Sequence, residues 1–524
     1  MKQILTLLTA LMLAPLASLQ AAELKLASVF GDHAVLQREA VVPVWGMADA
    51  GAEVAVEFDG QKKTTKADAT GKWMVKLDPL PASAVPRELK VSGVVIKDVL
   101  VGEVWLCGGQ SNMEWALSKC VGGPEAVERS ANPLLRLCLV PHNSQTSPRS
   151  DVAAKWSVSA PDAVKNFSAV AYWFGSKLQK ELGVPVGIIN NSYGGTQIQA
   201  WLPLATLKQG SWPRDKSYDF DLGKTDYERR RAEKQPEMDR YLAEKASAQK
   251  EGRPAPTMPQ GWPGDFRGPS VLWNGEVAPL LPFRIRGVAW YQGESNAYAG
   301  GSATYYRELL RALIKDWRAG FEQPELPFLV FQIARNRKPQ TDPNELSGIA
   351  ELQEAQMKAV QQTSDAALIV TTDLGEENVH YINKEPAGER GLKAALGLAY
   401  GRRIEASGPI FNELKVEGDK AVARFTHATG GLVAKDGPLL GFVIAGADKK
   451  FVFADARIVG DTVIVSSPQV PQPVAVRYGW ADHPKVNLFN GESLPASPFR
   501  TDDWPLGSTA SSLQSIAAPA QTKK

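Results

Sequence analysis

The sequence predicts an α/β protein: a three-layer domain, in which helices cover both faces of a parallel sheet, with a β domain on each side of it in the chain. Between residues 101 and 405, apolar runs alternate with stretches of helical periodicity, which is typical of parallel strands joined by crossover helices. Residues 23–100 and 406–507 contain short strand-like segments broken by Gly, Asp and Pro. A chain of 524 residues is longer than one core usually organises, so several domains are expected.

The first 22 residues have the pattern of a secretory signal peptide. Lys2 provides a positive charge, residues 4–16 are apolar, and the small residues Ala21 and Ala22 follow. The apolar run is too short to be a good membrane span, although a residual N-terminal anchor is the alternative. We therefore expect an exported protein, periplasmic or secreted, without a membrane span.

The charge of the sequence indicates which partners to expect, and its cysteines indicate which disulfide to expect. The formal net charge is +2 and no long basic run occurs, so we expect neither nucleic acid nor an anionic membrane as a partner. Cys120 and Cys138 are spaced to close a short loop, which as a disulfide would add roughly 3 kcal/mol. Cys107 ends an apolar run and is expected to be a buried free thiol. Nothing in the sequence indicates an oligomeric state.

Within the central region, each expected strand is a short apolar run. Buried strands are expected at residues 101–107, 184–190, 285–291, 326–333 and 366–372. Helices are expected at residues 170–182, 304–318, 347–362 and 386–403.

Two further segments interrupt or follow this pattern. An insertion at about 205–270 is strongly charged and is expected to be helical over 225–250, either as a solvated surface excursion or as a rim of the site. The last residues, 508–524, have little to bury and are expected to form a disordered tail.

The candidate site residues follow the expected strands, because open parallel sheets place functional groups at the carboxyl ends of their strands. After the first run, two glycines lead to Ser111, which is either a nucleophile or only a helix N-cap. After the second run come Gly194 and Gly195, whose N–H groups could approach a ligand closely or simply form a turn. After the third comes Asn296, whose side-chain amide could donate to an oxyanion or only cap a turn.

The candidate base is His380, which follows the last expected strand. The other histidines lie in the expected β domains (His33, His427) or in loops with no chemistry beside them (His142, His483). Only His380 combines the end of an α/β strand with nearby carboxylates, and a neutral imidazole there can take a serine proton at physiological pH.

The order Ser, Gly, Asn, His after successive strands resembles that of the SGNH hydrolases. The likeness is closer to the sialate O-acetylesterase family of carbohydrate esterases. The segments that carry it are FGDHAVLQR (30–38), VGEVWLCGGQSNMEW (101–115), YGGTQIQAW (193–201), GVAWYQGESNA (287–297), DLGEENVHYINKEPAGER (373–390) and LPASPFRTDDW (494–504). They span roughly residues 23–504, so the resemblance implies an SGNH-type fold for the α/β domain.

The resemblance also implies roles for individual residues. Ser111 would attack the acetyl carbonyl with His380 as base, and the N–H groups of Ser111, Gly194 or Gly195 and the Asn296 amide would form the oxyanion hole. Gln110, Gln292 and Glu294 would bind substrate. No metal or organic cofactor is implied.

The triad acid departs from the usual pattern. SGNH enzymes commonly place it three residues before the histidine, which is Glu377 here. Asp373 matches the DLG segment of the family and is preferred over Glu377, although it lies seven residues before the histidine. A Ser–His dyad oriented by a backbone carbonyl is the remaining possibility.

The expected substrate is an acetylated sugar or glycan, with O-acetylated sialic acid first. An acetylxylan or other plant-glycan deacetylase is the alternative within the same enzyme class. A non-catalytic glycan-binding protein is the alternative from another class, and the combined presence of Ser111, Asn296 and His380 argues against it.

Overall fold

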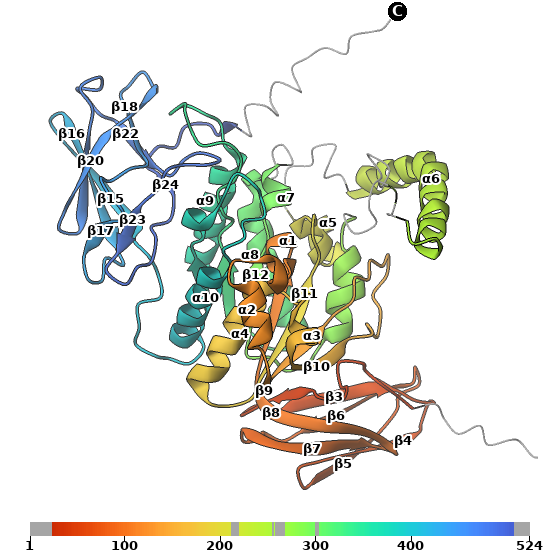
Figure 1. The fold of residues 1–524 in the computed structure, drawn as a ribbon. Helices are drawn as coiled ribbons and strands as arrows, with labels where there is room; N and C mark the ends of the chain where they lie inside the picture. Colours follow the sequence, from red (N-terminus) through yellow and green to blue (C-terminus); the bar gives the residue numbers. More distant parts are fainter. Residues whose placement is uncertain (1–23, 211–219, 254–255, 257–267, 299–302, 508–524) are drawn as a thin grey trace, which may run out of the picture.

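The computed structural model of this chain describes residues 24–210, 220–253, 256, 268–298 and 303–507 (Figure 1). The expected signal peptide and C-terminal tail lie outside these residues. Within them, no helix combines the length and the apolar character that a membrane span needs.

The centre of the molecule is a twisted sheet with the strand order β10-β9-β11-β8-β12-β13-β14. These strands are β8 (Val94–Gly109), β9 (Asn132–Leu139), β10 (Lys155–Ser159), β11 (Val186–Ser192), β12 (Gly287–Tyr291), β13 (Phe328–Phe331) and β14 (Ala366–Ile369). Neighbours from β9 to β14 are parallel, and β10 is antiparallel to β9. All five expected strands are therefore present, but the sheet is mixed and not purely parallel.

The sequence does not predict strands β9 and β10, because a charged residue interrupts β9 and because β10 is a short strand at the edge of the sheet. Arg136 interrupts the apolar run of β9 and is buried by an ion pair with Asp98, 2.6 Å away. A buried arginine that is paired in this way is compatible with a strand, but its partner lies 38 residues away in the chain. Strand β10 pairs with only one neighbour, so it shows no continuous apolar run.

Four long helices cover the two faces of this sheet (Figure 1). They are α4 (Ala169–Leu182), α8 (Ala303–Gly320), α9 (Gly348–Gln361) and α10 (Glu385–Leu398), close to the expected ranges. Helices α4 and α10 pack together on one face, and α8 and α9 pack together on the other. Helix α4 begins where Ser168 accepts a hydrogen bond from the Ala171 N–H and ends at Gly183, which is left-handed with φ 67°.

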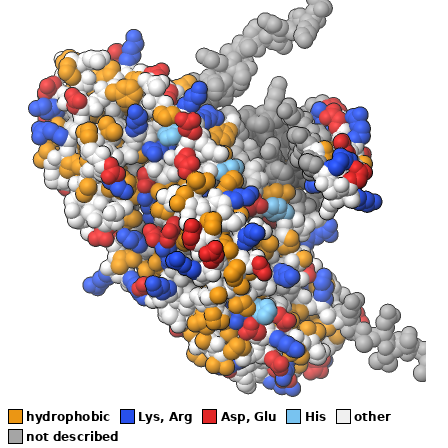
Figure 2. Space-filling view, in the orientation of Figure 1, with side chains coloured by type: hydrophobic (Ala, Val, Ile, Leu, Met, Phe, Trp, Pro, Cys, Tyr) orange, Lys and Arg blue, Asp and Glu red, His pale blue; other side chains and the backbone are white. Residues whose placement is uncertain are grey.

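The remaining helices are short, apart from the one in the insertion. They are α1 (Ser111–Glu114), η1 (Leu117–Lys119), α2 (Gly123–Glu128), α3 (Pro161–Val164), η2 (Ile198–Trp201), α5 (Leu204–Gln209), α6 (Phe220–Lys250), the π-helix η4 (Trp273–Val277), η5 (Ala278–Leu280), α7 (Glu294–Ala297) and η6 (Thr372–Leu374). Helix α6 is the charged helix expected in the insertion, and Figure 2 shows charged side chains of both signs gathered on it.

The N-terminal β domain consists of two packed sheets. One contains β1 (Lys25–Leu26), β3 (Val42–Met47) and β6 (Lys72–Leu77), and the other contains β2 (Val35–Gln37), β4 (Glu53–Phe58), β5 (Gln61–Lys66), β7 (Ser83–Val91) and the first half of β8. Strand β8 continues into the central sheet, so the expected boundary at residue 100 falls inside it. Glu103 of β8 is fully buried and binds Arg38 and Arg286, which fixes the junction.

The C-terminal β domain has a hydrophobic core of its own and lies beside α9 (Figure 1). Its strands are β15 (Ile410–Glu417), β16 (Lys420–Thr426), β17 (Leu432–Ala434), β18 (Phe442–Ala445), β19 (Phe451–Phe453), β20 (Asp455–Val459), β21 (Thr462–Ser466), β22 (Ala475–Tyr478), β23 (Leu488–Asn490) and β24 (Phe499–Arg500). Arg500 binds Glu354 of α9 at 3.1 Å, which joins the domain to the central one.

The three cysteines are all buried free thiols. This agrees with the expectation for Cys107 and corrects the expected pairing of Cys120 with Cys138. Cys138 lies inside β9, whereas Cys120 follows η1 and its thiol contacts the Ala116 carbonyl. Burial raises the pKa of the Cys120 thiol to about 11, so it stays protonated at neutral pH.

Candidate active site

The carboxyl ends of β8, β11 and β12 and the segment after β14 bring the candidate residues together. Ser111 opens α1 immediately after β8. The tight exit from the strand depends on Gly109, whose φ is 136° and where a Cβ would lie 2.0 Å from the Tyr291 carbonyl oxygen. Only glycine fits this position, because both the backbone conformation and the space exclude a side chain.

Ser111 and His380 form the centre of the site. The Ser111 Oγ lies 2.8 Å from His380 Nε2, although the two residues are 269 positions apart. The imidazole is half-buried and stacks on the Trp115 ring, with 4.5 Å between centroids. Burial, then the charge of Lys384, lowers the pKa of His380, and Glu114 opposes this only in part. The imidazole is therefore neutral at neutral pH and can accept the serine proton.

Neither expected triad acid is found beside His380. Asp373 makes a two-pronged ion pair with Arg390, at 2.7 Å for each oxygen, and Glu377 is exposed at the surface. Among the described residues, the hydrogen-bond partners of His380 are Ser111 and the Asn378 side chain, which accepts from the His380 N–H. The placement of Asp373 thus favours a structural role.

Two of the oxyanion-hole candidates already have protein partners. A Cβ added to Gly194 would lie 3.3 Å from the Ser111 Cβ, so this glycine is beside the serine, but its N–H donates to Glu114 Oε2 at 2.7 Å. Asn296 is buried, and its amide donates to the Gln199 side chain at 3.0 Å. Gly195 follows in a left-handed conformation with φ 75°.

Gln110, Gln292 and Glu294, which were expected to bind substrate, are at most 2% exposed. Gln110 Oε1 accepts from Gln292 Nε2 at 3.1 Å and from the N–H groups of Gly293 and Ser295, both at 3.2 Å. Gln292 also donates to Asn296 Oδ1 at 2.8 Å. These contacts join the loop after β12 to the serine turn, so the geometry gives these residues a positioning role.

A buried polar network that the sequence analysis missed lies beside the serine. Asn112 donates to Glu294 and to the Val379 carbonyl, and it accepts from Lys384 Nζ. The Lys384 ammonium also lies 3.5 Å from the Tyr381 ring centroid. Burial lowers the pKa of Lys384 to about 7 and raises that of Glu294. No local pattern marks Lys384, because its partners come from three separate segments.

A second missed group lies on the exposed side of the serine. His142, expected to have no chemistry beside it, lies with its Nε2 2.9 Å from Glu114 Oε1, and its ring stacks on Tyr193 at 3.6 Å. Burial lowers the pKa of His142, but the hydrogen bond and charge of Glu114 outweigh this and raise it overall. The spacing of the sequence offers a signal for Glu114, because this residue lies one helical turn after Ser111.

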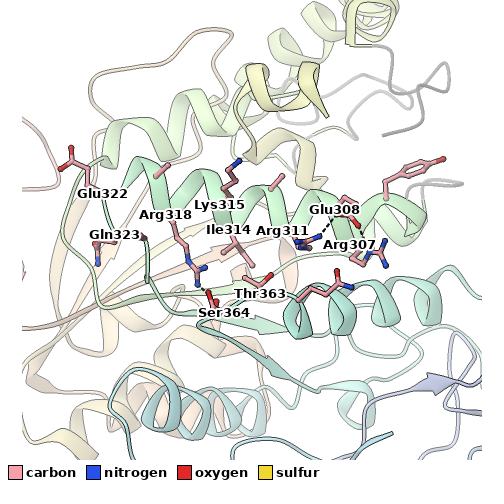
Figure 3. A pocket seen from close by; sticks show the side chains of 15 residues that line it. Arg307, Glu308, Arg311, Ile314, Lys315, Arg318, Glu322, Gln323, Thr363 and Ser364 are labelled. Carbon is pink, nitrogen blue, oxygen red and sulfur yellow. Dashed lines mark hydrogen bonds and ion pairs between the residues drawn. The ribbon is translucent and has the colours of Figure 1, made fainter. Parts of the chain in front are cut away.

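A large groove lies elsewhere. A groove of about 1120 Å³ runs along the outer side of α8, lined by charged side chains that include Arg311, Lys315 and Arg318 (Figure 3). Ser111 and His380 do not line it, so its size does not mark the chemistry. In the part of the chain that the structure describes, no group of three or more His, Cys, Asp or Glu side chains is arranged to hold a metal ion.

Comparisons with known proteins give the family of this chain. A family model described as carbohydrate esterase, sialic acid-specific acetylesterase, matches residues 274–395. A carbohydrate acetylesterase of Xanthomonas citri with a crystal structure is 37% identical, with a TM-score of 0.78 over 92% of this chain and 100% of that one. The Homo sapiens sialate O-acetylesterase is 26% identical over 91% of this chain and 92% of that protein. The Mus musculus sialate O-acetylesterase is 30% identical over 57% of this chain and 56% of that protein. The chain therefore belongs to the sialate O-acetylesterase family of carbohydrate esterases and is a carboxylic ester hydrolase.

Proposed function

We propose that this enzyme removes acetyl groups from O-acetylated sugars and that Ser111 is its nucleophile. Among these sugars, we propose O-acetylated sialic acid as the preferred substrate. The observation that carries the mechanism is the 2.8 Å contact between Ser111 Oγ and His380 Nε2. The substrate rests on the relatives, whose names specify acetyl esters of carbohydrate or sialic acid.

In the first half-reaction, His380 Nε2 takes the Ser111 proton as Oγ bonds to the acetyl carbonyl carbon. The carbonyl oxygen becomes an oxyanion, and the tetrahedral intermediate collapses when the bond to the sugar oxygen breaks. That oxygen takes the proton from His380 and leaves as a hydroxyl, so an acetyl group remains on Ser111. In the second half-reaction, water attacks with His380 as base, and acetate leaves.

The oxyanion would be held by the Ser111 N–H, by Gly194 or Gly195 and by the Asn296 amide. Ser111 is the first residue of α1, where backbone N–H groups have no partner within the helix. The Gly194 N–H would have to exchange Glu114 for the oxyanion, whereas the Gly195 N–H would not compete with that carboxylate. Because no carboxylate among the described residues is hydrogen-bonded to His380, the proposal is a Ser–His dyad.

Acetate release from p-nitrophenyl acetate by the mature enzyme, Ser111→Ala and His380→Ala tests the mechanism. Both substitutions should lower kcat by at least about 10³-fold, because each removes one partner of the nucleophile–base pair. Wild-type activity that survives in either variant would refute it. O-acetylated sialic acid and acetylated xylan are then compared as substrates.

We also propose that residues 1–22 are a signal peptide and that the enzyme is exported. Lys2 and the apolar run after it support this. N-terminal sequencing of the protein recovered from the periplasm or medium should begin near residue 23. An intact N-terminus that remains inside the cell would contradict it.

A further inference from the structure

We propose that Glu114, His142 and Tyr193 form a subsite that binds the sugar next to Ser111, through the C–H face of the sugar ring and through its hydroxyl groups. This inference rests on the proposed function, because it concerns the part of the substrate that carries the acetyl group. It would make His142 a residue that selects sugar esters over simple acetyl esters.

The surroundings of Ser111 decide where the sugar can extend from it. On one side of the serine, His380 is backed by the Trp115 ring. Toward the interior lies the network of Asn112 and Lys384, whose side chains are closed to solvent. Glu114 is 35% exposed and His142 is 42% exposed, so this side of Ser111 faces solvent.

The side chains on this solvent-facing side are held in fixed positions. The His142 and Tyr193 rings are nearly parallel, 5° apart, with 3.6 Å between centroids. His142 Nε2 contacts two acceptors, Glu114 Oε1 at 2.9 Å and the Ser192 carbonyl at 3.2 Å, so this nitrogen carries a proton. Stacking and two hydrogen bonds therefore fix a half-exposed ring that has no part in the Ser–His pair.

The fixed ring and the Glu114 carboxylate suit different parts of a sugar. The C–H face of a pyranose is apolar, and it packs well on the flat face of a ring held in place. A carboxylate can accept about four hydrogen bonds, and the described contacts of Glu114 use one on each oxygen. Sugar hydroxyls can therefore donate to Glu114. Its negative charge disfavours an anionic group, so a sugar carboxylate would point away from the subsite.

The test compares two ester substrates in each variant: an O-acetylated sialic acid methyl glycoside and p-nitrophenyl acetate. His142→Ala and His142→Gln should lower the ratio of the two kcat/KM values, sugar over aryl ester, about threefold to tenfold. His142→Gln keeps an N–H donor for Glu114 but has no ring, so it isolates the stacking. His142→Phe keeps a ring and should recover most of the ratio.

The matched control is His427→Ala, because His427 forms the same kind of exposed pair with Glu405, at 3.1 Å, in the C-terminal domain. Its ratio should equal that of the wild type. An active wild type whose ratio does not change in His142→Ala and His142→Gln would overturn the subsite alone. A wild type inert on both esters would overturn the proposed function and the subsite together.

Discussion

The two flanks of the Ser111–His380 pair are built in opposite ways. On the interior flank, Asn112, Glu294 and Lys384 are buried and bonded to one another. On the outer flank, Glu114 and His142 form a hydrogen-bonded pair that is partly exposed. A buried charge whose partner is lost is strongly destabilising, whereas an exposed pair contributes little to stability. The interior flank can therefore hold the site rigid, and the outer flank is the one that can bind a substrate.

The largest effect is expected from Lys384→Met on the interior flank. The change leaves the side-chain oxygen Oδ1 of Asn112 without its donor and Glu294 without a nearby cation. The free energy of unfolding should therefore fall by about 3 kcal/mol. Because Asn112 adjoins Ser111, kcat/KM should also fall about a hundredfold in the folded protein. Urea unfolding and steady-state kinetics measure both quantities.

The control for this variant is Lys177→Met. Lys177 has two carboxylate partners at 2.8 Å, Glu385 and Glu389, but its side chain is partly exposed. Its loss should cost less than about 1 kcal/mol and leave kcat/KM unchanged. Equal effects of the two substitutions would abolish the distinction between a buried and an exposed cation.

A second prediction asks whether an acid outside both flanks orients His380. Asp373→Asn should lower the free energy of unfolding by about 2 kcal/mol, because it weakens a nearly buried pair with Arg390. Once folded, this variant should keep kcat/KM within a few-fold of wild type. A drop of about 10⁴-fold, as expected for a triad acid, would show that Asp373 acts on His380 after all.

A third prediction concerns the pH dependence of kcat/KM. His380 must be neutral to act as base, and its pKa is below the ordinary value of 6.5 because of burial and then the Lys384 charge. The acidic limb of the profile should thus have its midpoint below pH 6.5. In Lys384→Met that midpoint should move upward, since one of the two causes is gone. A midpoint unaffected by the substitution would separate the interior flank from the base.

The sequence predicts the elements that have a local pattern, but not the contacts between residues far apart in the chain. The apolar runs predict the strands around β8. The residues that follow these runs include Ser111 and His380, because the ends of parallel strands meet at one edge of the sheet. The sequence does not predict the place of Lys384, because a lysine in a charged segment is normally solvated and only the fold places it beside Asn112. Nor does it predict the contact of His142 with Glu114, which is 28 residues away.

The smallest effect is expected from Glu114→Gln on the outer flank. Glutamine can still accept the Gly194 N–H, so the turn stays in place, but the negative charge beside His142 is lost. The pKa of His142 should fall, because the Glu114 carboxylate is what raises it against the effect of burial.

A pKa raised in the folded state stabilises the fold below the unfolded value of about 6.5, and this contribution is lost as the pH rises through the folded value. The substitution should therefore cost under about 1 kcal/mol, and only at low pH. NMR titration of the His142 ring protons and urea unfolding at pH 5 and pH 8 measure the two quantities. If the cost were several kcal/mol at both pH values, Glu114 would belong with the rigid interior flank, and the outer side of Ser111 would not be the adaptable one.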